Sequence, residues 1–298
     1  MKLFLCGNEI NIIQLGCTKS ANYCATYKKN AFFKIFRKIP ALIGFSLDNW
    51  KTEIKQYDTV VIFDTYYNSG LIKYILQHNN ARIVFYCWNS INKINKRIDF
   101  NRLRNNKRVE FWSYNYEDCL KYNMTYNPQF WNSSLIQYEN KEDNIYDLAF
   151  IGFAKDRLNI LNMMHKQCQK LKLNSYFYIN GYPDLNYNTN KNKAFMLYVN
   201  YINDIAAKSR AILDIVTDEN MGLTLRPLEA LFLKKKLVTN YTNIKNYDFY
   251  CKENVFIIGI DDMAHLEDFI HSKYKEIPQN IVEKYDIKAW EDRFGEAQ

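Results

Sequence analysis

The chain has 298 residues, of which 48% are hydrophobic, and this length and composition can bury two cores of ordinary domain size. Lys and Arg number 40 against 32 Asp and Glu, and the net charge of +8 favours an anionic partner such as a phosphorylated substrate, a membrane surface or a nucleic acid. No stretch approaches the roughly 18 apolar residues of a membrane-spanning helix, and the first residues lack a signal-peptide cleavage site, so we expect a cytoplasmic protein.

The residue pattern gives little support for metal or disulfide chemistry. The seven cysteines form no C-x-x-C pair, the four histidines are dispersed, and there is no D-x-D pair of aspartates. We therefore expect reduced thiols, no metal site and no cofactor. The 24 Tyr and 19 Phe are spread along the chain, which is typical of core packing, and no nucleic-acid partner is expected.

The first part of the chain alternates short apolar runs with helical patterns. The predicted strands span residues 2–6, 59–64, 82–88 and 109–114, and the predicted helices span 69–78 and 116–123. Asp64 ends its strand, where a carboxylate would act as a general base or cap a loop. The polar stretch 128–144 then predicts an interdomain linker.

Residues 27–39 combine basic and aromatic side chains. On a helix these separate partly into two faces, which suits an anionic membrane or a lipid-linked acceptor, or else an ordinary helix with a solvated basic face. Both interpretations stay open. The basic residues of the segment are Lys28, Lys29, Lys34, Arg37 and Lys38.

The second part of the chain repeats the alternation of strand and helix. Predicted strands span 147–152, 175–179, 211–216, 236–239 and 254–258, and predicted helices span 157–170, 195–208, 226–235 and 281–294. Such alternation predicts two parallel sheets covered on both faces, with ligands at the carboxyl ends of the strands. We expect one domain over residues 1–132, a second over 146–278, and a closing helix within 279–298.

The segment from Asp214 to Asn240 carries the clearest functional pattern. A strand leads into a loop with Gly222, and Thr224 is expected to cap the next helix. Arg226 and Glu229 follow in that helix, where the free N–H groups and a guanidinium would bind a diphosphate, and a carboxylate would accept bonds from a ribose diol. The structural alternative is that Arg226 pairs with a carboxylate and Glu229 complements the helix dipole.

Lys155 and Arg157 lie in the turn after the strand that ends at Gly152. Because this turn follows the first strand of the second domain, both side chains are further phosphate-binding candidates, or else solvated surface charges.

The decapeptide Gly222-Leu-Thr-Leu-Arg-Pro-Leu-Glu-Ala-Leu231 resembles the donor-binding segment of GT-B glycosyltransferases. With Arg at position 226, it resembles the branch of these enzymes that makes bacterial lipopolysaccharide and capsule. The segments 111–123 and 146–161 resemble that branch as well. Many retaining members carry a Glu just before the loop glycine, where this chain has Met221, so the resemblance does not imply a retaining mechanism.

The resemblance implies two Rossmann-like α/β domains facing across a cleft, with the closing helix crossing back to the first domain. It also implies transfer of a sugar from a nucleotide-sugar donor to a glycan or lipid-linked acceptor, without metal and with possible peripheral membrane contact. Another nucleotide-sugar enzyme such as an epimerase, or a non-catalytic nucleotide or nucleic-acid binding protein, is the alternative. The candidate donor-binding residues are Gly152, Lys155, Arg157, Gly222, Leu223, Thr224, Arg226 and Glu229.

Overall fold

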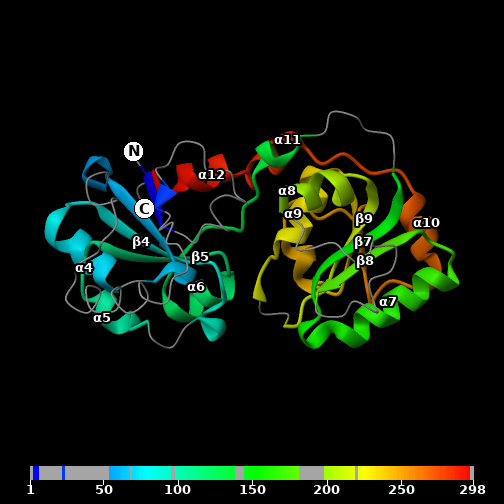
Figure 1. Cartoon of the computed structure of the whole chain (residues 1–298), viewed down its shortest axis with the longest axis horizontal. Helices are drawn as coiled ribbons and strands as arrows, with labels where there is room; N and C mark the ends of the chain where they lie inside the picture. Colours follow the sequence, from blue (N-terminus) through cyan, green and yellow to red (C-terminus); the bar gives the residue numbers. More distant parts are fainter. Residues whose placement is uncertain are drawn as a thin grey trace, which may run out of the picture. The chain divides into compact units, whose positions relative to one another are not determined.

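The computed structural model describes residues 3–6, 22–23, 54–67, 69–94, 98–137, 144–180, 198–218 and 221–295 (Figure 1). The chain divides into two compact units: unit 1 holds Met1–Pro128 and Glu291–Gln298, and unit 2 holds Gln129–Trp290. Each unit contains one parallel sheet with helices, so the predicted α/β class is confirmed. Within the described ranges, no helix combines the length and apolar character that a membrane span requires.

The sheet of unit 1 has the strand order β2-β1-β3-β4-β5-β6, and every neighbouring pair is parallel. The strands are β1 (Leu3–Cys6), β2 (Asn22–Tyr23), β3 (Thr59–Phe63), β4 (Arg82–Cys87), β5 (Val109–Ser113) and β6 (Thr125–Tyr126), and the helices are α4 (Ser69–His78), α5 (Phe100–Arg104) and α6 (Tyr116–Tyr122). The four predicted strands and two predicted helices all form. The short elements β2, β6 and α5 are not among the predicted ones.

Local signals explain where α6 begins and ends. The Asn115 side chain accepts hydrogen bonds from the backbone N–H of Glu117 at 3.0 Å and of Asp118 at 3.4 Å, which caps the first turn. Asn123 has φ +48°, a left-handed conformation that ends the helix. Asn123 therefore lies just outside the helix in which it was predicted.

The sheet of unit 2 has the strand order β11-β10-β9-β7-β8, again with every pair parallel. Its strands are β7 (Tyr146–Phe153), β8 (Ser175–Asn180), β9 (Ser209–Asp214), β10 (Lys236–Thr239) and β11 (Val255–Ile257). Counted from β7, this is the doubly wound order 2-1-3-4-5, which reverses between β7 and β9. Such a reversal opens a crevice at the carboxyl ends of the two strands.

Alternating side chains of the unit 2 sheet pack on its two faces. Leu148 and Phe150 belong to the core cluster that includes α7 and α10, whereas Ala149 belongs to the cluster that includes α9. In Figure 1, α7 and α10 lie on one side of β7, β8 and β9, and α8 and α9 lie on the other. The helices are α7 (Leu158–Lys170), α8 (Tyr198–Asn200) followed by a π-helical segment Tyr201–Ala206, α9 (Leu225–Phe232), α10 (Leu266–His271) and α11 (Gln279–Glu283).

The predicted linker at 128–144 is wrong at its start, because residues from Gln129 onward belong to unit 2. Phe130 and Trp131 are fully buried, and the Phe130 ring lies 4.2 Å from that of Trp290. The polar neighbours of these two aromatic residues suggested a linker. The boundary between the units therefore falls four residues before the predicted end of the first domain.

The predicted closing helix is broken into α11 and α12 (Ile287–Asp292). At the break, Trp131 donates its backbone N–H to Tyr285 O at 2.8 Å, and Ile287 donates to Trp131 O at 2.8 Å. Tyr285 and Ile287 thus pair with another part of unit 2 in place of continuing a helix. From Glu291 the chain belongs to unit 1, where the buried Phe294 ring lies 5.0 Å from that of Trp112.

Candidate functional site

The candidate site of unit 2 lies at the carboxyl ends of β7 and β9. After β7 the chain makes a single 3-10 turn, Lys155–Arg157, and enters α7. After β9 it runs through a loop to Gly222 and enters α9. Because β7 and β9 are neighbours on either side of the strand-order reversal, these two connections lie side by side at the carboxyl ends of the strands. We call Gly152, Arg157, Asp214, Thr224 and Arg226 the carboxyl-end site.

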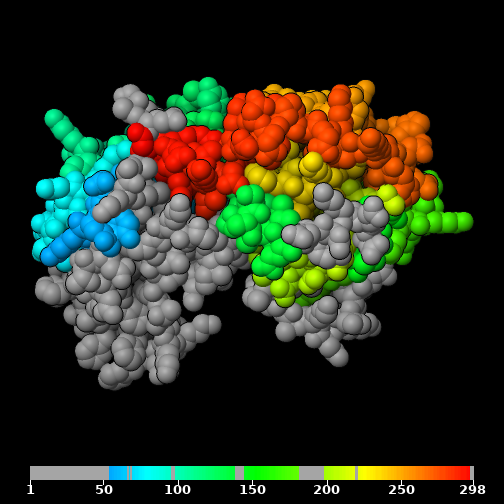
Figure 2. All heavy atoms as spheres, turned by 90° about the horizontal axis from the view of Figure 1, so that it is seen from above, coloured from blue at the N-terminus to red at the C-terminus, as the bar shows by residue number. Residues whose placement is uncertain are grey.

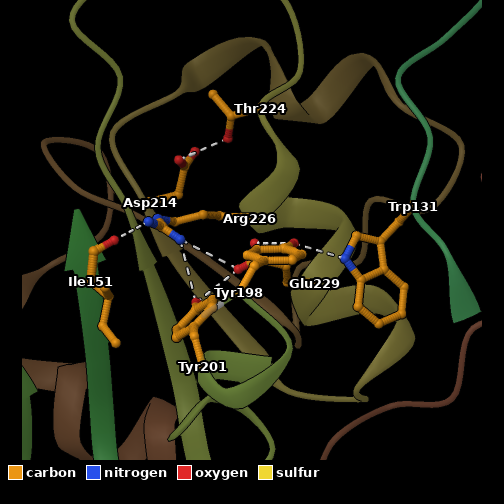
Figure 3. Close-up of polar contacts among 8 residues, drawn as sticks. All are labelled: Trp131, Ile151, Tyr198, Tyr201, Asp214, Thr224, Arg226 and Glu229. Carbon is orange, nitrogen blue, oxygen red and sulfur yellow. Dashed lines mark hydrogen bonds and ion pairs between the residues drawn. The ribbon is translucent and has the colours of Figure 1, made fainter. Parts of the chain in front are cut away.

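Arg226, in the first turn of α9, reaches back across the sheet to β7. Its Nη2 donates to the backbone carbonyl of Ile151, and its Nη1 lies 3.4 Å from Glu229 Oε2 and 3.3 Å from the Tyr201 hydroxyl (Figure 3). The guanidinium carbon lies 5.4 Å from the centre of the Phe150 ring. Burial lowers the pKa of Arg226, but Tyr201, Glu229 and Asp214 outweigh that effect and raise it above the ordinary value. The group is therefore a fixed positive charge.

Glu229, the predicted ribose-binding residue, is buried among side chains of unit 2. Its side chain is 1% exposed, and both carboxylate oxygens accept bonds inside the protein. Tyr198 donates to Oε1 at 2.7 Å and Tyr201 donates to Oε2 at 2.8 Å, while Trp131 Nε1 donates to the Tyr198 hydroxyl at 3.0 Å (Figure 3). A buried carboxylate needs such partners. Glu229 therefore fixes Arg226 and its tyrosines.

Thr224 occupies the position before α9, but the prediction that its side chain caps the helix is wrong. Its hydroxyl instead donates to Asp214 Oδ1 at 2.9 Å, and Thr239 donates to Oδ2 at 3.1 Å. Asp214 is 2% exposed, and burial raises its pKa against the opposing effect of Arg226. The first-turn N–H groups of α9 consequently receive no cap from Thr224.

Arg157 brings a second guanidinium to the carboxyl-end site. It donates to Ile215 O at 2.8 Å and to Phe153 O at 2.6 Å, and its buried Nε has no hydrogen-bond partner among the described atoms. Its pKa is lowered by burial and then by the charge of Arg226. A Cβ atom on Gly152 would lie 3.4 Å from Arg226 Nη2 and 3.6 Å from Arg157 Nη2, so both arginines converge on this glycine.

The remaining predicted donor-binding residues differ in backbone conformation and in exposure. Gly222 has φ +73°, which favours glycine, and it begins the approach to α9. Lys155 is exposed with φ +44°, at the edge of the carboxyl-end site. Leu223 is 1% exposed and its side chain is part of the core.

Asp64 follows β3 in unit 1 and is 7% exposed. Its Oδ1 accepts from the backbone N–H of Trp88 at 2.8 Å, and its Oδ2 accepts from the Asn89 side chain at 2.9 Å. Burial raises its pKa. These bonds join the ends of β3 and β4, which favours the loop-capping interpretation of Asp64. The basic candidates Lys28, Lys29, Lys34, Arg37 and Lys38 lie outside the described residues.

The sequence reasoning missed Tyr198 and Tyr201, which contact Glu229 and Arg226, and Trp131, which donates to the Tyr198 hydroxyl. Tyr198 and Tyr201 are three residues apart, a spacing that places two side chains on one helical face, and this was the available signal. Nothing near Trp131 in the sequence indicates its bond to Tyr198. The described residues contain no group of three or more His, Cys, Asp or Glu side chains placed to hold a metal ion.

No protein-family model matches the sequence, and a search of curated proteins finds no significant match.

The burial of Glu229 predicts that the Glu229→Gln variant loses stability. Gln keeps the shape but removes the charge that opposes Arg226, so we expect the free energy of unfolding to fall by about 2–4 kcal/mol. Urea denaturation followed by circular dichroism measures this change. Glu267→Gln, at an exposed position of α10, is the matched control and should change stability by less than about 0.5 kcal/mol. Unchanged stability of Glu229→Gln would mean that the buried network does not depend on the carboxylate.

Proposed function

We propose that the chain is a glycosyltransferase that moves a sugar from a nucleotide-sugar donor to a glycan or lipid-linked acceptor in bacterial surface polysaccharide synthesis. The observation that supports this most is the convergence of Arg157 and Arg226 on Gly152 at the strand-order reversal of unit 2. Doubly wound sheets bind nucleotides at this point. The segment that resembles the GT-B donor site supplies Arg226 and the start of α9.

The charges of the carboxyl-end site suit a diphosphate. Arg226 is balanced by the buried Glu229, whereas no described carboxylate forms an ion pair with Arg157. An anion would add a counter-charge and a partner for the unpaired Nε, and guanidinium groups bind phosphate oxygens with two parallel hydrogen bonds. The start of α9, which the Thr224 side chain does not cap, would add the backbone N–H groups of Leu225 and Arg226 and the positive end of the helix dipole.

Sugar transfer requires stabilisation of the negative charge that develops on the leaving diphosphate. Positive groups that are already fixed in place lower this barrier, because they need no rearrangement as the charge forms. In the proposal, Arg157, Arg226 and the exposed Lys155 carry this role, and Glu229 is a positioning residue for Arg226. The proposed GT-B architecture adds that the two sheets present their carboxyl ends to a shared cleft. Both carboxylate oxygens of Asp64 accept hydrogen bonds within unit 1, so the proposal gives Asp64 no catalytic role and names no general base.

Arg157→Gln should weaken the binding of nucleotide sugars by about 10- to 100-fold, since a charge-assisted hydrogen bond contributes about 1.5–3 kcal/mol. Thermal shift against UDP-, GDP-, TDP- and CMP-sugars identifies the donor nucleotide, and calorimetry measures the affinity. Arg102→Gln, which removes an exposed arginine of α5 in unit 1, is the matched control and should bind as the parent does.

Two outcomes would contradict the proposal. Salt-sensitive binding of an oligonucleotide with no response to any nucleotide sugar would favour a nucleic-acid binding protein. Conversion of the bound nucleotide sugar to its isomer, without transfer of the sugar to an added acceptor and release of nucleoside diphosphate, would favour an epimerase.

We further expect transfer to proceed without a divalent metal, because the sequence has no D-x-D pair and two arginines are present to neutralise the leaving group. Release of nucleoside diphosphate should therefore be the same in EDTA and in manganese. Loss of turnover in EDTA with recovery on adding manganese would show that the metal, and not the arginine pair, carries this charge.

A further inference from the structure

A cavity of unit 2 lies at the amino ends of its strands, opposite the carboxyl-end site. It has a volume of about 620 Å³ and is lined by the turn that precedes β10, by the start of β9 and by the segment after α10. Figure 2 shows the segment from α10 to α11, in orange, on the surface of the molecule. We call this cavity the amino-end pocket, and its charged lining residues are Arg210, Lys234, Lys235, Lys236, Lys273 and Glu276.

Two of these cations have carboxylate partners. Arg210 Nε lies 3.4 Å from Asp147 Oδ1, an oxygen that also lies 2.9 Å from His271 Nε2, and Lys234 Nζ lies 2.7 Å from Glu276 Oε2. In contrast, no carboxylate in the described ranges forms an ion pair with Lys235, Lys236 or Lys273. Among its described lining residues, the amino-end pocket therefore carries an excess of positive charge.

Lys236 makes this excess unusual, because its side chain is buried. The residue is 2% exposed, and its ammonium donates to the backbone carbonyls of Glu253 and Lys273. An ammonium has three N–H donors, so these carbonyls leave one of them for a further partner. The Phe269 ring, whose centre lies 5.1 Å from Nζ, offsets part of the cost of burying this charge, and a bound anion would offset more of it. Burial lowers the pKa of Lys236, as expected for such a setting.

Lys235 adds a second ammonium with weakened proton affinity. Its Nζ donates to Asn144 Oδ1 at 2.9 Å, which is a neutral acceptor. Burial, followed by the charge of Arg210, lowers the pKa of Lys235 to about 8. Bringing an anion beside Lys235 would reverse this effect, because opposite charge favours the protonated form.

We propose that the amino-end pocket binds a small molecule that carries a phosphate or diphosphate group, with its charge against Lys235, Lys236 and Lys273. The volume falls in the range typical of small-molecule sites, about 300–1,000 Å³. Phe232, Leu233 and Tyr274 also line the pocket and provide apolar surface for the organic part of the ligand. This inference is independent of the proposed function.

The amino-end pocket and the carboxyl-end site are separate. Arg210 lies near the start of β9 and Asp214 at its end, and the four residue steps between them span about 13 Å. A ligand in one site therefore does not contact the other, and the amino-end pocket would act as an effector site with respect to chemistry at the carboxyl ends.

The test uses pyrophosphate and inorganic phosphate as probes, titrated into the full chain by calorimetry at constant ionic strength. Pyrophosphate should bind to the parent, and Lys235→Gln/Lys273→Gln should weaken this binding by at least tenfold. The matched control, Lys245→Gln/Lys252→Gln, removes two exposed lysines of the same unit that do not line the pocket, and it should bind as the parent does. Lys236, whose buried ammonium donates to two backbone carbonyls, stays in place in every variant.

Arg157→Gln separates this site from the proposed donor site. Retention of a pyrophosphate site in Arg157→Gln, and its loss in Lys235→Gln/Lys273→Gln, supports the amino-end pocket whether or not nucleotide sugars bind. Equal weakening of pyrophosphate binding in both double variants would show non-specific charge attraction. Loss of pyrophosphate binding in Arg157→Gln alone would place the pyrophosphate at the carboxyl ends. Either result overturns the inference. Co-sedimentation of the parent with phosphatidate vesicles, lost in Lys235→Gln/Lys273→Gln, would identify a lipid headgroup as the source of the phosphate. Binding of pyrophosphate without co-sedimentation would identify a soluble phosphate compound.

Discussion

The guanidinium of Arg226 is the group on which the candidate site depends. It extends from the first turn of α9 to the Ile151 carbonyl on β7, and it is held by Glu229 and Tyr201. Because a buried charge is stable only with close partners, this contact fixes where α9 begins relative to the strand ends. The tyrosines around Glu229, with the bond from Trp131, extend the same constraint to the segment that opens unit 2.

Both ends of the unit 2 sheet hold cationic side chains that no described carboxylate neutralises. At the carboxyl ends, the two buried carboxylates near Arg226 are committed: Glu229 to Arg226 and the tyrosines, and Asp214 to the hydroxyls of Thr224 and Thr239. Arg157 makes its bonds to backbone carbonyls, which neutralise no charge. At the amino ends, Lys236 is likewise buried against carbonyls. Both places favour an anion, and they differ in the residues that would select it.

The sequence predicted the parts of the fold that depend on local pattern. The β-branched run at 59–63 and the apolar periodicity of 69–78 are sufficient to define β3 and α4, and the polar turns mark the ends of β7 and β9. Pairing between distant segments was not predictable: the backbone bonds between Trp131 and residues 285–287 break a helix that periodicity extends to 294. The same limit applies to the site. Arg226 was identified from its position, whereas the burial of Glu229 depends on tyrosines far away in the sequence.

Hydrogen–deuterium exchange with UDP, GDP and TDP tests the central claim most directly, because it reports which strand ends contact the nucleotide. The account predicts that the nucleotide that binds slows exchange at residues 153–158 and 221–226, the two connections that meet at Arg157 and Arg226. Slowed exchange confined to residues 234–236 and 270–276, or binding with no protection at either connection, would contradict a nucleotide site at the carboxyl ends of β7 and β9.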